Sequence, residues 1–325
     1  MMEKKGKLQF KSGSSSLKQQ ILVAIGISVL LFIITIIMNP ASLNRNAFGA
    51  ILSLVIILTL ASAGQTLAVV SGGIDMSIGA TMSMTALVTA GIMQGQDGHF
   101  IMTLALSLVI GVAIGVVNGI GVAKVGLPPM IVTMCVANVV TRLQYVITSG
   151  KPSGNAGPWF VKSMTHRFFG VVPSSIIYMA IMFLIVIFIM NFSRYGQQLF
   201  LSGSNERAAH LNGIRTVKVK IITYALSGLL AGLAGFLGAG YMTFVVCGTF
   251  EAYTMSSIIA VVVGGTLLVG GKGSYIGTLS GALLITVLTN GLSVLNVSSA
   301  TTDMIMGVVL IILLTAYNRS APVRQ

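Results

Sequence analysis

Apolar runs close to the length of a bilayer-crossing helix, about 20 residues, follow one another along almost the whole chain. Ten such runs cover residues 21–38, 47–70, 76–93, 100–123, 128–148, 173–191, 217–241, 253–269, 275–295 and 302–317. Charged residues make up only 8% of the chain, against about 25% in soluble domains. A soluble fold is therefore excluded, and the sequence predicts an all-α, polytopic transmembrane helical bundle with about ten spans.

The loops between the runs differ in charge, and this difference predicts orientation. Of the 19 Lys and Arg residues, Arg142 falls within a span and four fall on one side, namely Arg45, Lys151, Lys162 and Arg167; the other 14 fall on the opposite side. Because basic loops stay in the cytoplasm, both termini are expected there. The same pattern accounts for the net charge of +13, so we expect the lipid bilayer, and no nucleic acid, as partner.

Three parts follow from this reading. Residues 1–20 form a basic cytoplasmic tail, residues 21–318 a transmembrane domain, and residues 319–325 a cytoplasmic C-terminal tail. No small-residue cleavage site follows Met38, so the first run is interpreted as an uncleaved helix. One long loop lies inside, at about 192–216. The other lies outside, at 149–172, and its Gly, Pro and aromatic residues are compatible with lying on the membrane or dipping into it.

Motifs for covalent chemistry are missing from the sequence. It contains no HExxH, CxxC or GxSxG pattern, and Cys135 and Cys247 lack metal-type spacing. The segment GGTLLVGGKGS, at 264–274, fails the nucleotide-binding P-loop pattern because Gly271 stands where Lys is required. We expect no catalytic residue, no metal and no cofactor in this chain, so an energy-driven process would need another subunit or an ion gradient.

The segment SGGIDMSIG, at 71–79, interrupts the apolar pattern. Gly72 and Gly73 favour a sharp turn, and Ser77 is placed to cap the helix that follows. Asp75 is either a capping residue at the membrane edge or a gate residue, because acidic groups are costly within membrane segments. A similar glycine pair, Gly264 and Gly265, follows AVVV at 260–263; chance could also produce this short echo.

The segment from 123 to 152 places polar groups within an apolar run. Pro128 and Pro129 open the run, where a missing N–H costs least. Asn138 and Arg142 should face neighbouring helices or a wet cavity rather than lipid. For Arg142 an interhelical pair or snorkelling to the surface is an equal alternative. With Asn118 in the preceding run, these residues are candidates for the lining of a passage.

The segment YGQQLFLSGSNERAAHLNGIRTVKVK, at 195–220, is the most specific. Residues 206–211 are predicted to form a short amphipathic helix that Gly213 ends with a left-handed cap. Such a helix is either an ordinary solvated connector or a docking knob that projects from the membrane domain.

Four motifs together resemble one family. SGGIDMSIG, NGIGVAKVGLPPMIVTM, YGQQLFLSGSNERAAHLNGI and VVVGGTLLVGGKGSYIGTLSGALL have the order and spacing seen in permease subunits of bacterial ATP-driven (ABC) sugar importers of the ribose, xylose and galactose type. The resemblance covers about 47–317. Departures are small: Ser204 replaces a glycine, and Met76 and Lys272 replace the commoner Leu and Arg.

The resemblance implies a non-enzymatic subunit of the bacterial cytoplasmic membrane that works as a homodimer. It implies an ABC ATPase partner that binds ATP and an extracytoplasmic sugar-binding protein. It implies alternating access, with Gly72, Gly73, Asp75, Ser77, Asn118, Asn138, Arg142, Gly264 and Gly265 as candidates for the passage and its gate. Coupling to the ATPase is expected at Gly203, Asn205, Glu206, Arg207, Ala208, Ala209, Leu211 and Gly213.

The sequence is compatible with more than one solute and more than one class of membrane protein. Close relatives of such permeases carry pentoses, hexoses, galactofuranose or autoinducer-2, so the sequence does not name the solute. A secondary transporter driven by an ion gradient would need ionisable groups near mid-membrane, and this chain offers few. A membrane enzyme is disfavoured because no paired carboxylates or metal cluster occur.

Overall fold

The computed structural model describes residues 12–40, 44–242 and 244–318. The expected terminal tails therefore lie largely outside the described residues. Most of the described chain is helical, and β1 and β2 form a two-residue antiparallel pair. The elements are α1 (Ser12–Met38), α2 (Arg45–Val70), α3 (Ile78–Met93), the 3₁₀ turn η2 (Asp97–His99), α4 (Phe100–Ala123), α5 (Pro129–Thr148), α6 (Pro158–Thr165), β1 (Arg167–Phe168), β2 (Val172–Pro173), α7 (Ile176–Asn191), α8 (Arg194–Ser204), α9 (Glu206–Leu211), α10 (Thr216–Tyr241), α11 (Tyr253–Val263), α12 (Tyr275–Val294) and α13 (Ser299–Asn318).

The expected number of ten spans is not confirmed. Six helices of the described chain are long and apolar enough to cross a membrane, and the pair α7 and α8, bent by 63°, makes up to seven. The helices α3 and α11 and the described part of α13 are shorter. The prediction that the eighth run continues to residue 269 was wrong, because α11 ends at Val263. With 11 residues, α11 is only about 16 Å long, roughly half of the hydrocarbon core.

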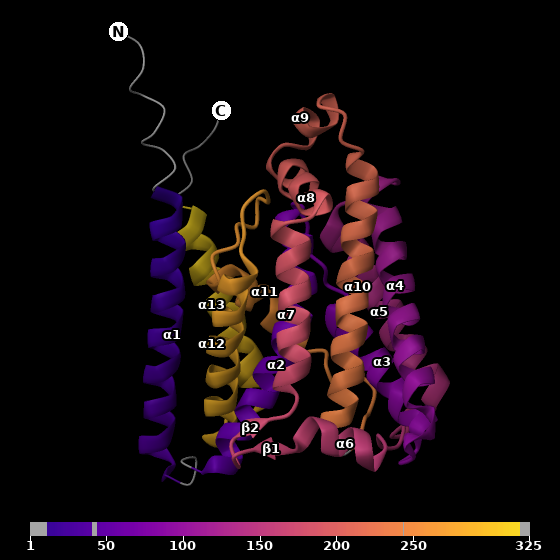
Figure 1. Cartoon of the computed structure of the whole chain (residues 1–325), viewed down its shortest axis with the longest axis vertical. Helices are drawn as coiled ribbons and strands as arrows, with labels where there is room; N and C mark the ends of the chain where they lie inside the picture. Colours follow the sequence, from indigo (N-terminus) through magenta and orange to yellow (C-terminus); the bar gives the residue numbers. More distant parts are fainter. Residues whose placement is uncertain (1–11, 41–43, 243, 319–325) are drawn as a thin grey trace.

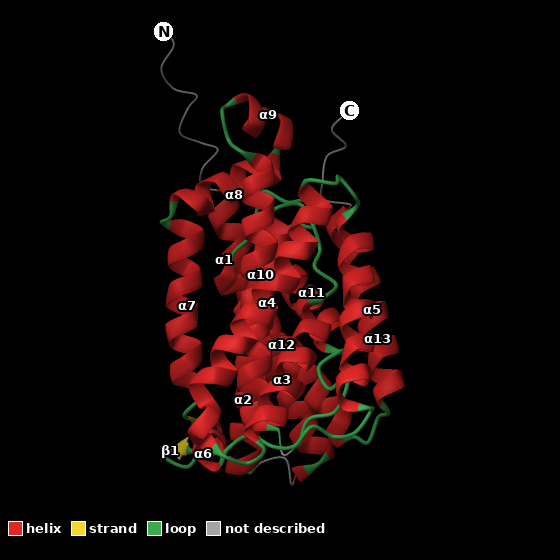
Figure 2. Cartoon of the chain, turned by 90° about the vertical axis from the view of Figure 1, so that its right-hand side faces the viewer, coloured by secondary structure: helices red, strands yellow, loops and turns green. Residues whose placement is uncertain are grey.

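The helices form an upright bundle whose two ends differ. In Figure 1 the start of α1, the helices α8 and α9, and the end of α13 lie at one end, and α6 with β1 and β2 lies at the other. Figure 2 shows the same order after a quarter turn, with α9 projecting beyond the bundle. The coupling segment and the loop at 149–172 are thus at opposite ends, as the sequence predicted.

The outer surface of the bundle is apolar where it would meet lipid. On α4 and α7, for example, Ile101, Val109, Leu184 and Phe188 are between 62% and 79% exposed. Large apolar side chains with this exposure are suited to a lipid environment and unsuited to water. This surface agrees with an integral membrane protein.

Glycines let the two central helices touch. On α4, Gly111 faces the backbone of Gly228 on α10, and a Cβ at Gly115 would meet the backbone of Tyr224. A Cβ on Gly232 would meet the carbonyl oxygen of Ser107. Small residues at four-residue spacing allow such close packing in membranes, so α10 and α4 form the rigid centre of the fold.

The short helices α3 and α11 begin next to each other inside the bundle. The backbone N–H of Gly79 donates to Thr254 Oγ1 at 3.0 Å, and that of Phe250 donates to Ser83 Oγ at 2.9 Å. A side chain of α11 thus accepts a backbone N–H at the start of α3, and a side chain of α3 accepts one just before α11. These bonds satisfy backbone groups that would otherwise be unpaired within the membrane.

The loop at 149–172 closes the end opposite α9. Its helix α6 lies across the bundle in Figure 1, with Phe160 and Met164 buried. The carboxylate of Asp97 accepts the backbone N–H groups of Trp159 and Phe160 at 2.8 and 3.1 Å, and so caps α6. The loop therefore forms a cap over the helix ends, anchored by the buried side chains of Phe160 and Met164.

Candidate coupling and translocation site

The short helix α9 is a compact knob with defined ends. Asn205 occupies the N-cap and its side chain accepts the backbone N–H of Ala208 at 2.9 Å. At the other end Gly213 has φ +80°, and the N–H of Ile214 donates to the carbonyl of Ala209 at 3.1 Å. This is the left-handed cap expected from the sequence. The prediction of a six-residue helix at 206–211 is confirmed.

Most of the predicted coupling residues are presented to the surroundings. Asn205, Glu206, Arg207 and Ala208 are exposed, as is Gly213. Leu211 is 80% exposed, although its side chain is apolar. Ala209 alone on α9 is buried, and it attaches the helix to the bundle. Burial of an exposed leucine side chain against a partner protein would be favourable, because it removes apolar surface from water.

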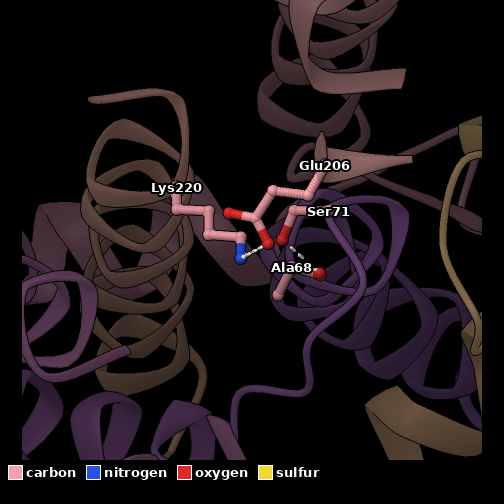
Figure 3. A network of polar contacts seen from close by, with 4 residues as sticks. All are labelled: Ala68, Ser71, Glu206 and Lys220. Carbon is pink, nitrogen blue, oxygen red and sulfur yellow. Dashed lines mark hydrogen bonds and ion pairs between the residues drawn. The ribbon is translucent and has the colours of Figure 1, made fainter. Parts of the chain in front are cut away.

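An ion pair braces α9 against α10. Glu206 Oε2 lies 2.6 Å from Lys220 Nζ. Figure 3 shows Glu206 pointing back from α9 toward Lys220, near the end of α2, where the Ser71 hydroxyl donates to the Ala68 carbonyl at 2.7 Å. Sequence reasoning used Lys220 only in the charge count, because nothing in the local pattern pairs it with a residue 14 positions earlier.

Glycines connect α8 to the loops that interrupt the bundle. A Cβ on Gly203 would meet the carbonyl oxygen of Val70, and that oxygen accepts the backbone N–H of Gly271 at 2.9 Å. A Cβ on Gly270 would lie 2.9 Å from Gly72 Cα. The end of α8, the end of α2 and the loop between α11 and α12 therefore meet backbone to backbone, directly beside the knob.

Asp75 ties the α2–α3 break to two other helices. Its Oδ1 accepts both the N–H and the hydroxyl of Ser77, at 2.9 and 2.6 Å, and its Oδ2 accepts the hydroxyl of Ser227 on α10 at 2.7 Å. Asn118 on α4 donates to Ser77 Oγ at 2.8 Å. All four side chains are buried. The structure thus brings Asp75, Ser77 and Asn118 together, and the sequence missed Ser227.

One detail of that prediction was wrong. Ser77 holds the N-cap position of α3, but its side chain makes no capping bond, because the hydroxyl donates to Asp75 instead. Thr133 on α5 adds a further tie that the sequence did not indicate: it accepts the N–H of Met76 at 3.0 Å and donates to the carbonyl of Ile74 at 3.2 Å. The break is held by side chains from three helices.

The second glycine pair lies apart from that cluster. Gly264 packs against the backbone of Gly277 at the start of α12. Gly265 has φ +85°, and the N–H of Thr266 donates to the Val261 carbonyl at 3.2 Å, which caps the end of α11. Gly72, with φ +86°, caps α2 in the same manner. The segments after α2 and after α11 thus begin with the same capping motif. The left-handed residue is the first glycine of the pair in one case, Gly72, and the second in the other, Gly265.

Asn138 and Arg142 stand apart from both breaks. Each is exposed, on the face of α5 turned away from α3 and α4. Within the described chain no ion pair involves Arg142. The neighbouring Gln144 is buried and faces the other way: it donates to the Ala80 carbonyl at 3.1 Å and accepts the N–H of Gly248 at 3.0 Å.

No cluster of metal-ligating side chains occurs among residues that the structure describes. Cys135 and Cys247 are both free thiols. The arrangement consists of a projecting capped helix, two capped breaks and a buried hydrogen-bond network.

Comparison with known proteins shows which family the chain belongs to. A family model described as the permease component of branched-chain amino acid transport systems matches residues 47–314. The chain belongs to this family of ABC-transporter permeases. It is 33% identical to the ribose import permease RbsC of Escherichia coli K12, over 93% of this chain and 94% of the relative.

Other relatives agree. RbsC of Bacillus subtilis is 34% identical over 89% of each chain, and the fructose import permease FruF of Bifidobacterium longum is 32% identical over 77% of this chain and 71% of the relative. No solved structure matches significantly. The chain is thus a membrane-embedded transport subunit of the sugar-import permease type, as the four motifs predicted.

Proposed function

We propose that this chain is the membrane-spanning subunit of an ATP-driven importer that moves a monosaccharide, of the pentose or hexose class, into the bacterial cytoplasm across the inner membrane. The proposal is supported above all by α9: a capped, ion-paired helix with an exposed leucine, projecting from one end of an apolar bundle. The full-length similarity to ribose import permeases favours a sugar over the amino acids named in the family description.

In this proposal a separate ATPase binds ATP and docks on α9. The charge count places that end in the cytoplasm, and an extracytoplasmic binding protein would then deliver the sugar at the α6 end. When two ATPases close on ATP, paired knobs approach each other. Two copies of this chain switch between outward-open and inward-open states, with Gly72 to Ser77 and Gly264 to Gly265 as moving segments.

The passage is expected between two copies, along the exposed face of α5. Asn138 and Arg142 are polar, lie within a membrane helix and face away from their own bundle. Contact with lipid would be costly for both side chains, so a second copy or a wet passage is the better neighbour. We keep both residues as pathway candidates on this ground.

The test is sugar uptake with and without the ATPase. Membrane vesicles containing this chain, the ATPase and the binding protein should take up D-ribose or D-fructose only in the presence of ATP. Uptake by this chain alone, driven by an ion gradient, would contradict the proposal and support the secondary-transporter alternative. ATP-dependent uptake of autoinducer-2, and of neither sugar, would leave the proposed mechanism unchanged and identify a different solute.

Docking is tested separately by Leu211→Ala. Loss of this exposed side chain should weaken co-purification of the ATPase, because burying a leucine side chain at an interface contributes about 1.5–3 kcal/mol. Phe169→Ala is the matched control, since Phe169 is 98% exposed at the opposite end. Equal ATPase recovery in both variants would argue against α9 as the docking site.

A further inference from the structure

A cavity of about 300 Å³ lies between α2, α11, α12 and α13, in a part of the molecule that none of the candidate residues above occupies. Leu54 and Leu58 contribute to it from the first half of α2. That half adjoins the α6 end, since Gly49 faces Arg167 of β1. Small-molecule sites have volumes from roughly 300 Å³ upward, so one small solute fits.

The lining of this cavity is rich in hydroxyl groups. They come from three helices, with Ser256 on α11, Thr286, Thr289 and Ser293 on α12, and Thr302 on α13. Asp303 adds a carboxylate, and the lining contains no Lys or Arg. The hydroxyls of Thr289 and Thr302 already donate to backbone carbonyls and keep lone pairs as acceptors, so the surface presents several acceptors beside one carboxylate.

One lining group, Thr286, is buried without a partner, whereas Asp303 is exposed. Thr286 is 4% exposed, and its Oγ1 has no hydrogen-bond partner within the described chain. No described cation pairs with Asp303. A buried polar atom without a partner is unfavourable, and it is explained when a ligand supplies the missing hydrogen bond.

We propose that this cavity is a transient binding site for the transported solute, and that the solute is a neutral polyhydroxylated molecule, a monosaccharide. The proposal rests on the proposed function and adds the place and chemistry of a substrate site. Sugar hydroxyls both donate and accept, so they can satisfy Thr286 and Asp303 together. Leu58 and Met306 supply apolar surface for C–H groups. The lining contains no Lys or Arg, so it offers no cationic partner for the carboxylate of an amino acid.

Protection from chemical labelling tests the site directly. In a full-length chain carrying Cys135→Ser and Cys247→Ser, Ser293→Cys is treated with a small hydrophilic thiol reagent in membrane vesicles. We expect D-ribose or D-fructose to slow this reaction severalfold. Thr301→Cys is the matched control: Thr301 is exposed on α13 outside the cavity, and sugar should leave its labelling rate unchanged.

A second substitution separates binding from folding. Thr286→Val keeps the side-chain shape and removes a hydroxyl without an intramolecular partner, so the free protein loses nothing. Added to Ser293→Cys, it should raise the sugar concentration for half-protection roughly two- to tenfold, the loss of one hydrogen bond. Thr81→Val removes another buried, unpartnered hydroxyl on α3, a helix that does not line the cavity, and should have no effect.

The outcomes distinguish the two proposals. Sugar uptake by the assembled importer without protection at Ser293→Cys by either sugar overturns the site and leaves the proposed function intact. Protection that Thr286→Val does not change overturns the assigned contact. Protection without ATP-dependent uptake supports the site and contradicts the proposed function.

Discussion

A single methyl group at Gly203 should disturb the link between the docking knob and the two breaks. A Cβ there would meet the Val70 carbonyl oxygen, which already accepts the N–H of Gly271 at 2.9 Å. Overpacking costs about 1–3 kcal/mol, and a lost hydrogen bond about 0.5–1.5 kcal/mol. Alanine recovers at most about 1 kcal/mol through helix propensity. The net disturbance of Gly203→Ala is therefore roughly 0.5–3.5 kcal/mol.

That disturbance acts on an equilibrium between two conformations. If it falls on one of them, a disturbance of this size changes their ratio by roughly two- to 300-fold. We therefore expect Gly203→Ala to reduce ATP-driven sugar uptake at least about twofold while ATPase co-purification stays normal, because α9 itself is unchanged.

The assay compares uptake, ATP hydrolysis and ATPase co-purification at equal amounts of membrane-inserted protein. Gly26→Ala is the matched control, since a Cβ on Gly26 would meet nothing within 4 Å. Normal uptake and normal stimulation of ATP hydrolysis in Gly203→Ala would refute the idea that motion passes through this junction.

Three further substitutions probe neighbouring features. Gly213→Val should weaken ATPase co-purification, because φ +80° is unfavourable for a β-branched residue; recovery equal to wild type would show that the cap does not matter. Glu206→Gln should lower uptake only modestly, because an exposed ion pair is worth about 0.2–1 kcal/mol, and the loss should be smaller at high salt. If the effects of Glu206→Gln and Lys220→Met on uptake are additive in a double-mutant cycle, the ion pair does not brace α9. Arg142→Leu should reduce uptake with ATPase binding intact, and unchanged uptake would remove Arg142 from the passage.

Long uniform helices could be predicted from sequence because their apolar runs end at polar or glycine residues. The predicted limits 100–123 and 47–70 match α4 and, at its end, α2. The coupling helix was also predictable, since Asn205 and Gly213 carry local capping signals. In each case the information lies within a few residues of the helix end.

The break after α11 was less predictable because hydropathy does not change there. Residues 264–269 are as apolar as the helix before them, yet α11 ends at Val263 because Gly265 adopts a left-handed conformation. The bond between Asp75 and Ser227 joins residues 152 positions apart. A serine in a membrane helix gives no local sign of such a partner, so this part of the site required the fold.

The central claim is that a separate ATPase drives this permease through α9. A photo-crosslinking amino acid introduced at Leu211, in native membranes containing the assembled importer, tests it most directly. The account predicts an adduct with the ATPase subunit and none from a control position at Phe169. An adduct from Leu211 with a protein on the outer face, or labelling of this position only from outside, would contradict it.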